Sequence, residues 1–168
     1  FFPDPSVVRV GDDYYMANST FQYFPAIAIS HSRDMIHWHV IGHAITDSEE
    51  LDLRDIKDSH GIWAPDINKI GDKYVMYYSM STWGGEWTCG IGIATADKPE
   101  GPFTDLGKLF RSNEINIQNC IDPFYIEDEG RKYLFWGSFH GIYAVELSDD
   151  GLSLKENTRP LRVAGDAY

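Results

Sequence analysis

The sequence predicts an all-β protein that forms part of a β-propeller, and three observations support this prediction. First, the chain repeats one pattern with a period of about 50–60 residues, which is typical of a propeller blade. Second, each repeat contains short strands separated by turn signals, and nothing shows a sustained helical period. Third, aromatic residues make up 14% of the chain, which is typical of strongly β proteins or of proteins that bind sugars.

Each repeat presents its elements in the same order. The first begins at Phe2 with "FPDPSVVRVGDDYYMANST", the second at Trp63 with "WAPDINKIGDKYVMYYSMST", and the third at Cys120 with "CIDPFYIEDEGRKYLFWGSF". An aspartate beside a proline opens a short apolar strand, a Gly/Asp turn follows, and an aromatic strand comes next ("YYMANS", "YVMYYS", "YLFWGS"). A third strand ("AIAIS", "GIGIAT", "GIYAVELS"), a polar turn and a short outer segment complete the repeat.

These repeats indicate one domain, residues 1–168, which is part of a larger propeller. The predicted blades lie at about residues 1–46, 61–110 and 118–160, and a fourth begins at about 161–168. Three blades do not close a ring, and an unclosed set leaves sheet faces and edges without partners. We therefore expect that further blades complete the propeller in the parent protein.

Composition narrows the classes of function. Apolar residues make up 43% of the chain, which is enough for a core and argues against disorder. The formal net charge of −12 repels phosphate backbones, which argues against nucleic acid as a partner. No apolar run approaches the ~20 residues that a membrane span needs. Cys89 and Cys120 have neither ligand-like spacing nor a disulfide framework, so we interpret them as buried thiols.

Two aspartates are the candidate catalytic residues. Asp4 and Asp122 each precede a proline at the start of a first strand, and the first strands of a propeller surround its axis. Carboxylates that converge there can perform acid–base chemistry, and glycoside hydrolysis needs two of them. A lone Asp-Pro pair is usually a turn former. Two such pairs at equivalent positions of a repeat, with aromatic residues around them, favour a functional site.

Four ordered segments carry a family resemblance. The segments "FFPDPSVVRVGDDYYMANSTFQYFP", "GIWAPDINKIGDKYVMYYSMST", "GIGIATADKPEGPF" and "IDPFYIEDEGRKYLFWGSF" resemble glycoside hydrolase family 43, and together they cover essentially the whole chain. That family contains β-xylosidases, α-L-arabinofuranosidases and endo-arabinanases. The resemblance implies a five-bladed β-propeller in the parent protein, with about three blades present in this chain, and hydrolysis with inversion.

The resemblance also implies roles for the two aspartates. Asp4 matches the general base, which activates water, and Asp122 matches the residue that orients the general acid and tunes its pKa. The family's general acid is a glutamate at the start of the fourth blade. The final "GDAY" resembles the lead-in to that glutamate, so we expect it just after residue 168, and we expect residues 1–168 alone to be inactive. Glu100 in "EGP" matches a blade-closing turn and is not a candidate for this role.

Further residues are candidates for sugar binding. Trp63 in "GIWAP" matches a position that faces the pocket in the family, and a flat indole stacks on the apolar face of a sugar ring. The alternative is a tryptophan of the core. The same choice between site and packing applies to weaker candidates at strand ends and in loops, namely Phe21, Phe24, Trp83, Ser138 and His140. Asp66 in "WAPD" leads the second repeat, and we interpret it as structural.

We expect no catalytic metal and no required cofactor. The six histidines do not supply the three or four convergent ligands that zinc needs. Some arabinanase-like members of the family hold calcium near the axis, so the resemblance is compatible with a structural calcium ion. The expected partner is an oligosaccharide or polysaccharide. Because such polymers lie outside the cell, we expect a secreted or periplasmic protein, and no signal peptide is visible in this chain.

Alternatives remain open at this point for both substrate and function. The segment "STFQYFP" favours a xylosidase or arabinofuranosidase, whereas "SMSTWGGEWTCGIGIATA" favours an arabinanase. The sugar, the endo or exo mode and the oligomeric state therefore stay open. The alternative to an enzyme is a non-catalytic propeller that binds carbohydrate or serves as a scaffold.

Overall fold

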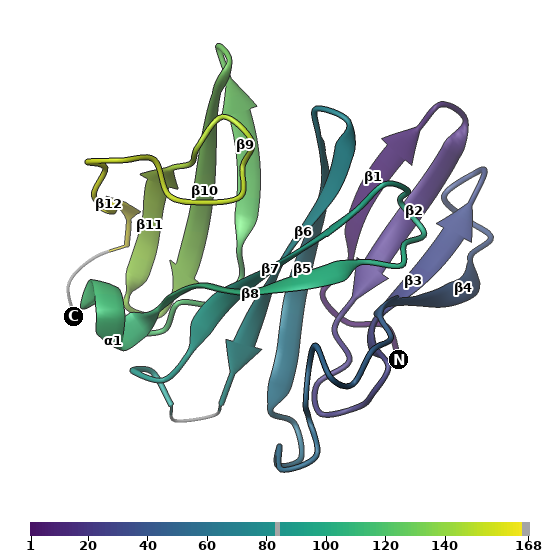
Figure 1. The fold of residues 1–168 in the computed structure, drawn as a ribbon, viewed down its shortest axis with the longest axis horizontal. Coiled ribbons are helices and arrows are strands. Elements are labelled where there is room, and N and C mark those ends of the chain that lie inside the picture. Colours follow the sequence, from purple (N-terminus) through teal and green to yellow (C-terminus); the bar gives the residue numbers. More distant parts are fainter. Residues whose placement is uncertain (83–84, 166–168) are drawn as a thin grey trace.

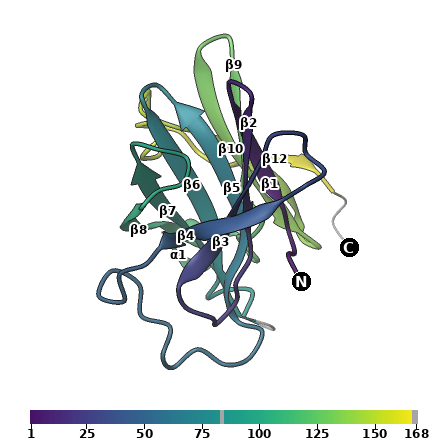
Figure 2. The same cartoon turned by 90° about the vertical axis from the view of Figure 1, so that its right-hand side faces the viewer.

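The computed structural model describes residues 1–82 and 85–165, and its architecture is all-β. Twelve strands form three four-stranded antiparallel sheets that stand side by side (Figures 1 and 2). Within each sheet the strands follow chain order, as in the blades of a propeller. The described residues thus confirm the predicted fold class and the three blades.

The first blade contains β1 (Ser6–Val10), β2 (Asp13–Asn18), β3 (Ala26–Ser32) and β4 (His39–Ile45). The second blade contains β5 (Gly61–Ile70), β6 (Lys73–Ser81), β7 (Gly90–Ala96) and β8 (Thr104–Arg111). A four-residue helix, α1 (Ser112–Ile115), follows β8. The third blade contains β9 (Phe124–Asp128), β10 (Arg131–Ser138), β11 (Gly141–Glu146) and β12 (Leu161–Ala164).

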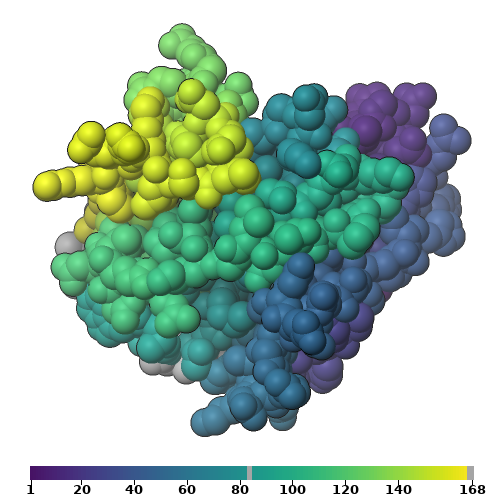
Figure 3. Space-filling view, in the orientation of Figure 1, coloured from purple at the N-terminus to yellow at the C-terminus, as the bar shows by residue number. Residues whose placement is uncertain are grey.

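The outermost strand of the third blade corrects one predicted boundary. Residues 161–164, which the sequence assigns to the start of a fourth blade, instead form β12 and pair with β11. The reason lies in the preceding segment, because Ser148 and Ser153 close it into a compact loop through hydrogen bonds to each other. The chain therefore reaches the outer edge of the blade only at Leu161. Figure 3 shows the loop that leads to β12, in yellow, on the surface of the third blade.

Two apolar clusters hold the three blades together, and β6 contributes side chains to both. Successive side chains of a strand point to opposite faces, so Tyr74, Met76 and Tyr78 join the first cluster, whereas Val75 and Tyr77 join the second. The first cluster lies between the first and second blades and includes Ile27, Ile29, Ile45, Ile62 and Ala94. The second lies between the second and third blades and includes Ile91, Phe110, Leu134, Trp136 and Leu147. Because β6 and β7 are buried on both faces, their central stretches are apolar, from Tyr74 to Tyr78 and from Gly90 to Ala94.

Backbone hydrogen bonds also connect the first two blades. Phe21 and Ile62 form a two-way bridge, with N···O distances of 2.9 and 3.0 Å. Gly61 precedes this bridge and has a φ of +99°, where a side chain is strained. A Cβ atom at Gly61 would lie 2.5 Å from the carbonyl oxygen of Phe21. Glycine at this position therefore lets the two blades approach each other.

We predict that Gly61→Ala lowers the free energy of unfolding by about 2 kcal/mol or more, through backbone strain and displacement of Phe21. Urea unfolding of the full-length protein measures this loss. The matched control is Gly42→Ala in β4, where an added Cβ meets no atom within 4 Å. We expect the control to change stability by less than about 0.5 kcal/mol. Equal effects of the two substitutions would contradict this account of the bridge.

Candidate active site

The first strands of the three blades begin around one open cleft. The cleft has a volume of about 440 Å³, and its walls are the segments 4–7, 64–68 and 122–125. These segments lead into or form β1, β5 and β9, and β5 lies between the other two (Figure 1). Both candidate catalytic residues, Asp4 and Asp122, line the cleft and are exposed to it.

The backbone is strained at three matching positions of this cleft. Asp4, Ala64 and Asp122 have φ angles of +52°, +36° and +57°, and each stands directly before a proline. Such angles are uncommon for residues other than glycine and gather at functional sites. Ala64 is therefore the second-blade counterpart of the two aspartates. Asp66, which the sequence suggests as the leading aspartate of that repeat, lies two residues farther along β5.

Asp66 connects the three first strands to one another. Its side chain is buried, with 7% of the residue exposed, and it accepts hydrogen bonds from Ser6 Oγ, Asn68 Nδ2 and the Tyr125 amide, each at 2.8 Å. Ser6 belongs to β1 and Tyr125 to β9. Burial raises the pKa of Asp66, and these hydrogen bonds oppose that shift. These contacts agree with the interpretation of Asp66 as a structural residue.

Asp4 is held by a hydroxyl from the end of the neighbouring strand β2. Ser19 Oγ donates to Asp4 Oδ2 at 2.5 Å and accepts from the Ala64 amide at 2.6 Å. The amide of Ser19 and the side-chain amide of Asn18 both donate to the Pro3 carbonyl. The residues around the end of β2 thus fix the backbone and the side chain of the segment that carries Asp4.

The negative charge of Asp4 affects the pKa of Asp122. Desolvation by the surrounding protein raises the pKa of Asp122, and the negative charge of Asp4 raises it further. Its backbone amide donates to Ser79 Oγ, at the end region of β6, at 2.9 Å. Among the described residues its carboxylate has no hydrogen-bond partner, so both oxygens are free for a group that enters the cleft. The negative charge of Asp4 therefore acts on Asp122 within the same cleft.

A smaller pocket of about 160 Å³ opens beside the aspartate cleft. It brings together two predicted sugar-binding residues, Trp63 and Ser138. Ile121, directly before Asp122, also lines it, so the pocket and the cleft adjoin along the chain. The indole of Trp63 donates to the Ser59 carbonyl at 3.0 Å, which fixes the ring. Asn119 donates its side-chain amide to Ser138 Oγ at the same pocket.

The other predicted sugar-binding residues line neither the cleft nor this pocket among the described residues. Phe21 is half-buried at the bridge to Ile62, Phe24 is 39% exposed, and His140 is exposed in the turn between β10 and β11. Trp83 lies outside the described residues. The binding roles of these four residues stay predictions.

Two serines, Ser19 and Ser79, take part in the site but were not singled out by sequence reasoning. A signal for them exists, because each aromatic strand of the repeat closes with serine in "YYMANS", "YVMYYS" and "YLFWGS". The contacts of these serines join residues far apart in the chain, so their role becomes visible only when the blades are placed side by side.

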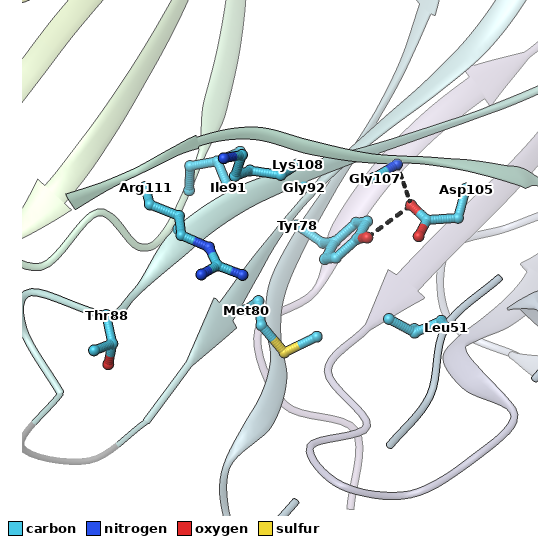
Figure 4. A pocket seen from close by; sticks show the side chains of 11 residues that line it. Leu51, Tyr78, Met80, Thr88, Ile91, Gly92, Asp105, Gly107, Lys108 and Arg111 are labelled. Atoms are coloured by element: carbon cyan, nitrogen blue, oxygen red, sulfur yellow. Dashed lines mark hydrogen bonds between the residues drawn. The ribbon is translucent and has the colours of Figure 1, made fainter. Parts of the chain in front are cut away.

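A separate pocket of about 180 Å³ lies on the second blade and contains none of the predicted site residues (Figure 4). Its walls come from β6, β7, β8 and the segment around Leu51. Asp105 accepts hydrogen bonds there from the Tyr78 hydroxyl and the Gly107 amide, at 2.7 and 3.1 Å. These contacts leave Asp105 engaged within the blade, so we assign the functional site to the aspartate cleft instead.

Neither a metal cluster nor a helix that could span a membrane is found in the part of the chain that the structure describes. Residues 1–82 and 85–165 contain no group of three or more His, Cys, Asp or Glu side chains that could hold a metal ion. Over the same ranges, no helix is long and apolar enough to cross a membrane.

We predict that Asp66→Ala lowers the free energy of unfolding by about 2–4 kcal/mol, because three donors lose their acceptor, among them the buried amide of Tyr125. Chemical denaturation of the full-length protein measures the change. The matched control is Asp97→Ala, whose side chain is 82% exposed and pairs with Lys73 on the surface. We expect little change in the control, because exposed ion pairs contribute little to stability. A mild effect of Asp66→Ala would show that Asp66 does not hold the strands together.

We also predict that Asp4→Asn lowers the pKa of Asp122, because the substitution removes a like charge that raises it. The pKa should stay above its usual range, since desolvation, the larger cause, remains. Carboxyl-carbon NMR titration of the full-length protein measures the shift. The control is Asp12→Asn, because the side chain of Asp12 is 86% exposed on the β1–β2 turn. This substitution should leave the pKa of Asp122 unchanged. An unchanged value in Asp4→Asn would contradict the coupling.

The chain is similar to known proteins over almost its whole length. The sequence profile described as "Glycosyl hydrolases family 43" matches residues 1–167. The chain is 38% identical over 164 residues to a xylan 1,3-β-xylosidase from Vibrio sp., covering 89% of this chain and 29% of the relative. It is 32% identical over 165 residues to a probable arabinan endo-1,5-α-L-arabinosidase A from Aspergillus oryzae, covering 97% of this chain and 49% of the relative.

Solved structures show the same relationship. The GH43 protein BlXynB from Bacillus licheniformis matches with a TM-score of 0.81 and 38% identity, over 99% of this chain and 32% of that chain. The α-L-arabinanase of Cellvibrio cellulosa matches with a TM-score of 0.79 and 27% identity, over 97% of this chain and 53% of that chain. The chain thus spans about a third of its xylosidase relatives and about half of its arabinanase relatives. By its sequence profile and its fold, this chain belongs to glycosyl hydrolase family 43.

Proposed function

We propose that the full-length protein hydrolyses glycosidic bonds in arabinose- or xylose-containing polysaccharides or oligosaccharides, with inversion at the anomeric carbon. Family membership supports the reaction class. The observation that carries the proposal is the pair of exposed, electrostatically coupled carboxylates, Asp4 and Asp122, on strained backbone in one cleft. Glycoside hydrolysis requires one carboxyl group as base and one as acid. Of the two aspartates, Asp4 is the proposed base and Asp122 the proposed residue that tunes the acid.

In this proposal Asp4 is the general base. Its carboxylate faces the cleft and would accept a proton from the water that attacks the anomeric carbon. Asp122 tunes the general acid, because a nearby negative charge keeps a carboxylic acid protonated to higher pH. By family resemblance the proposed acid is a glutamate. In an inverting enzyme, acid and base stand about 6.5–9.5 Å apart, which leaves room for the water.

The pocket next to the cleft is the proposed binding place for the sugar ring. Trp63 offers an indole whose orientation is fixed through Ser59, and Ser138 and Asn119 offer polar groups beside it. An aromatic face with a few polar groups is the usual composition of a sugar site.

The names of the relatives support xylose and arabinofuranose as the candidate sugars. Several relatives are xylosidases, and others are arabinanases, including one solved in complex with arabinohexaose. We place xylosides and arabinofuranosides first, since a xylosidase relative and an α-L-arabinofuranosidase relative are 38% and 39% identical, against 32% for the arabinanase relative. A secreted or periplasmic location is part of the proposal. An extracellular endo-α-(1→5)-L-arabinanase from Thermotoga petrophila, 29% identical over 192 residues, supports it.

The test is turnover of xylo-oligosaccharides, arabino-oligosaccharides and the matching aryl glycosides by the full-length protein. Proton NMR of the first product formed reads its anomeric configuration, and we expect inversion. We predict that Asp4→Asn lowers kcat about 10²–10⁴-fold, the usual contribution of a general base. Asp12→Asn, a substitution of an exposed aspartate on the neighbouring turn, should keep wild-type kinetics.

Three results would argue against parts of this proposal. Wild-type turnover by Asp4→Asn would remove Asp4 from the role of base. A product with retained configuration would overturn the inverting mechanism. Binding of these sugars without any hydrolysis would support the alternative, a non-catalytic carbohydrate-binding propeller.

A further inference from the structure

The hydroxyl of Ser19 has only one way to arrange its hydrogen bonds. A backbone amide can only donate, so Ser19 Oγ accepts from the Ala64 amide, at 2.6 Å. Its single proton is then directed to Asp4 Oδ2, at 2.5 Å. That length is typical of a hydroxyl that donates to a carboxylate. Ser19 is 6% exposed, so water does not compete effectively for this proton.

This arrangement distinguishes the two oxygens of Asp4. Oδ2 is occupied by the Ser19 hydroxyl, whereas Oδ1 has no hydrogen-bond partner among residues 1–82 and 85–165. Asp4 itself lines the open cleft. Oδ1 is thus the oxygen that can receive a proton from a water molecule in the cleft.

Comparison with the second blade shows which of the two hydrogen bonds of Ser19 is structural. Ser79 accepts a hydrogen bond from the amide of Asp122, which begins the leading segment of the third blade. In the same way, Ser19 accepts one from the amide of Ala64 in the second blade. Both serines therefore hold the leading segment of the following blade. The second blade, however, has Ala64 where the first has Asp4, so Ser79 has no such carboxylate to bind. The bond from Ser19 to Asp4 is an addition to the structural pattern.

We propose that Ser19 is a positioning residue, which holds Oδ2 of Asp4 so that Oδ1 is presented to the attacking water. This inference rests on the proposed function, because it takes Asp4 as the general base. It also connects the base to the sugar pocket, since the Ala64 amide that Ser19 binds follows Trp63 directly. Ser19 does not touch the reacting atoms and acts only through Asp4.

A double-mutant cycle in the full-length protein tests the proposal. The variants are Ser19→Ala, Asp4→Asn and the combination of both, assayed on an aryl xyloside or arabinofuranoside with a good leaving group. We expect Ser19→Ala to lower kcat about 10- to 100-fold, the loss expected for a hydrogen bond to a charged group, with KM changed less than about threefold. In the Asp4→Asn background the same substitution should have almost no further effect on kcat.

The matched control is Thr20→Val, one residue along the chain. Its hydroxyl also accepts from a backbone amide, that of Ile27 at 3.0 Å, but does not contact Asp4. It should lower stability about as much as Ser19→Ala and leave kcat near the wild-type value. Thermal unfolding of every variant establishes that differences in kcat do not come from loss of fold. If Ser19→Ala does not fold, Ser19→Cys replaces it in the same cycle, because a thiol fills the site and binds the carboxylate more weakly.

The outcomes separate this inference from the proposed function. Wild-type activity of Asp4→Asn overturns the proposed function, and the inference with it. Loss of activity in Asp4→Asn, with Ser19→Ala no worse than Thr20→Val, keeps the function and overturns the inference. If Ser19→Ala lowers kcat equally in the wild-type and Asp4→Asn backgrounds, the inference is also overturned. The serine would then affect activity through the structure in general and not through Asp4. Loss that depends on Asp4 supports it.

Discussion

The hydrogen bond that the leading amide of one blade donates to a serine hydroxyl of the preceding blade is the contact on which the geometry of the cleft depends. Ser19 accepts from the Ala64 amide, and Ser79 accepts from the Asp122 amide. The residues that donate these bonds have positive φ and precede a proline, a conformation that persists only where its surroundings hold it. The hydroxyls provide that restraint. Each of these two blades thereby holds the leading backbone of the next, and in the third blade that backbone carries Asp122.

Apolar packing and hydrogen bonds hold the blades together in different parts of the molecule. Away from the cleft, the alternating side chains of β6 fill the clusters on both sides of the second blade, and burial of that surface stabilises the stack. At the cleft, polar contacts also join the first strands. There Asp66 accepts three hydrogen bonds from two other strands and its own. A buried carboxylate is costly unless it is satisfied, and here each donor is buried or half-buried beside it.

The sequence predicts the local features of this fold well and the long-range ones only in part. Strands and hairpin turns follow from alternation and turn residues, and the three blades are found as predicted. The strand β12 was missed because its pairing depends on how the loop around Ser148 closes, which the repeat pattern does not encode. Asp66 was aligned with Asp4 because both adjoin a proline. Only the φ angles show that Ala64 is the true counterpart.

The presence of alanine at position 64 has a physical reason within this arrangement. The Ala64 amide and the Asp4 carboxylate meet at a single hydroxyl, which has one proton to donate. A carboxylate at position 64 would place a third negative charge on the cleft and raise the pKa of its neighbours. It would also place a side chain close to the ring of Trp63, one residue earlier. Alanine keeps the repeat's backbone, which Ser19 needs as a donor, and omits the charge. The same backbone conformation thus carries an acidic side chain in the first and third blades and a neutral one in the second. Asp4 and Asp122 are therefore the only two of these three positions that are charged.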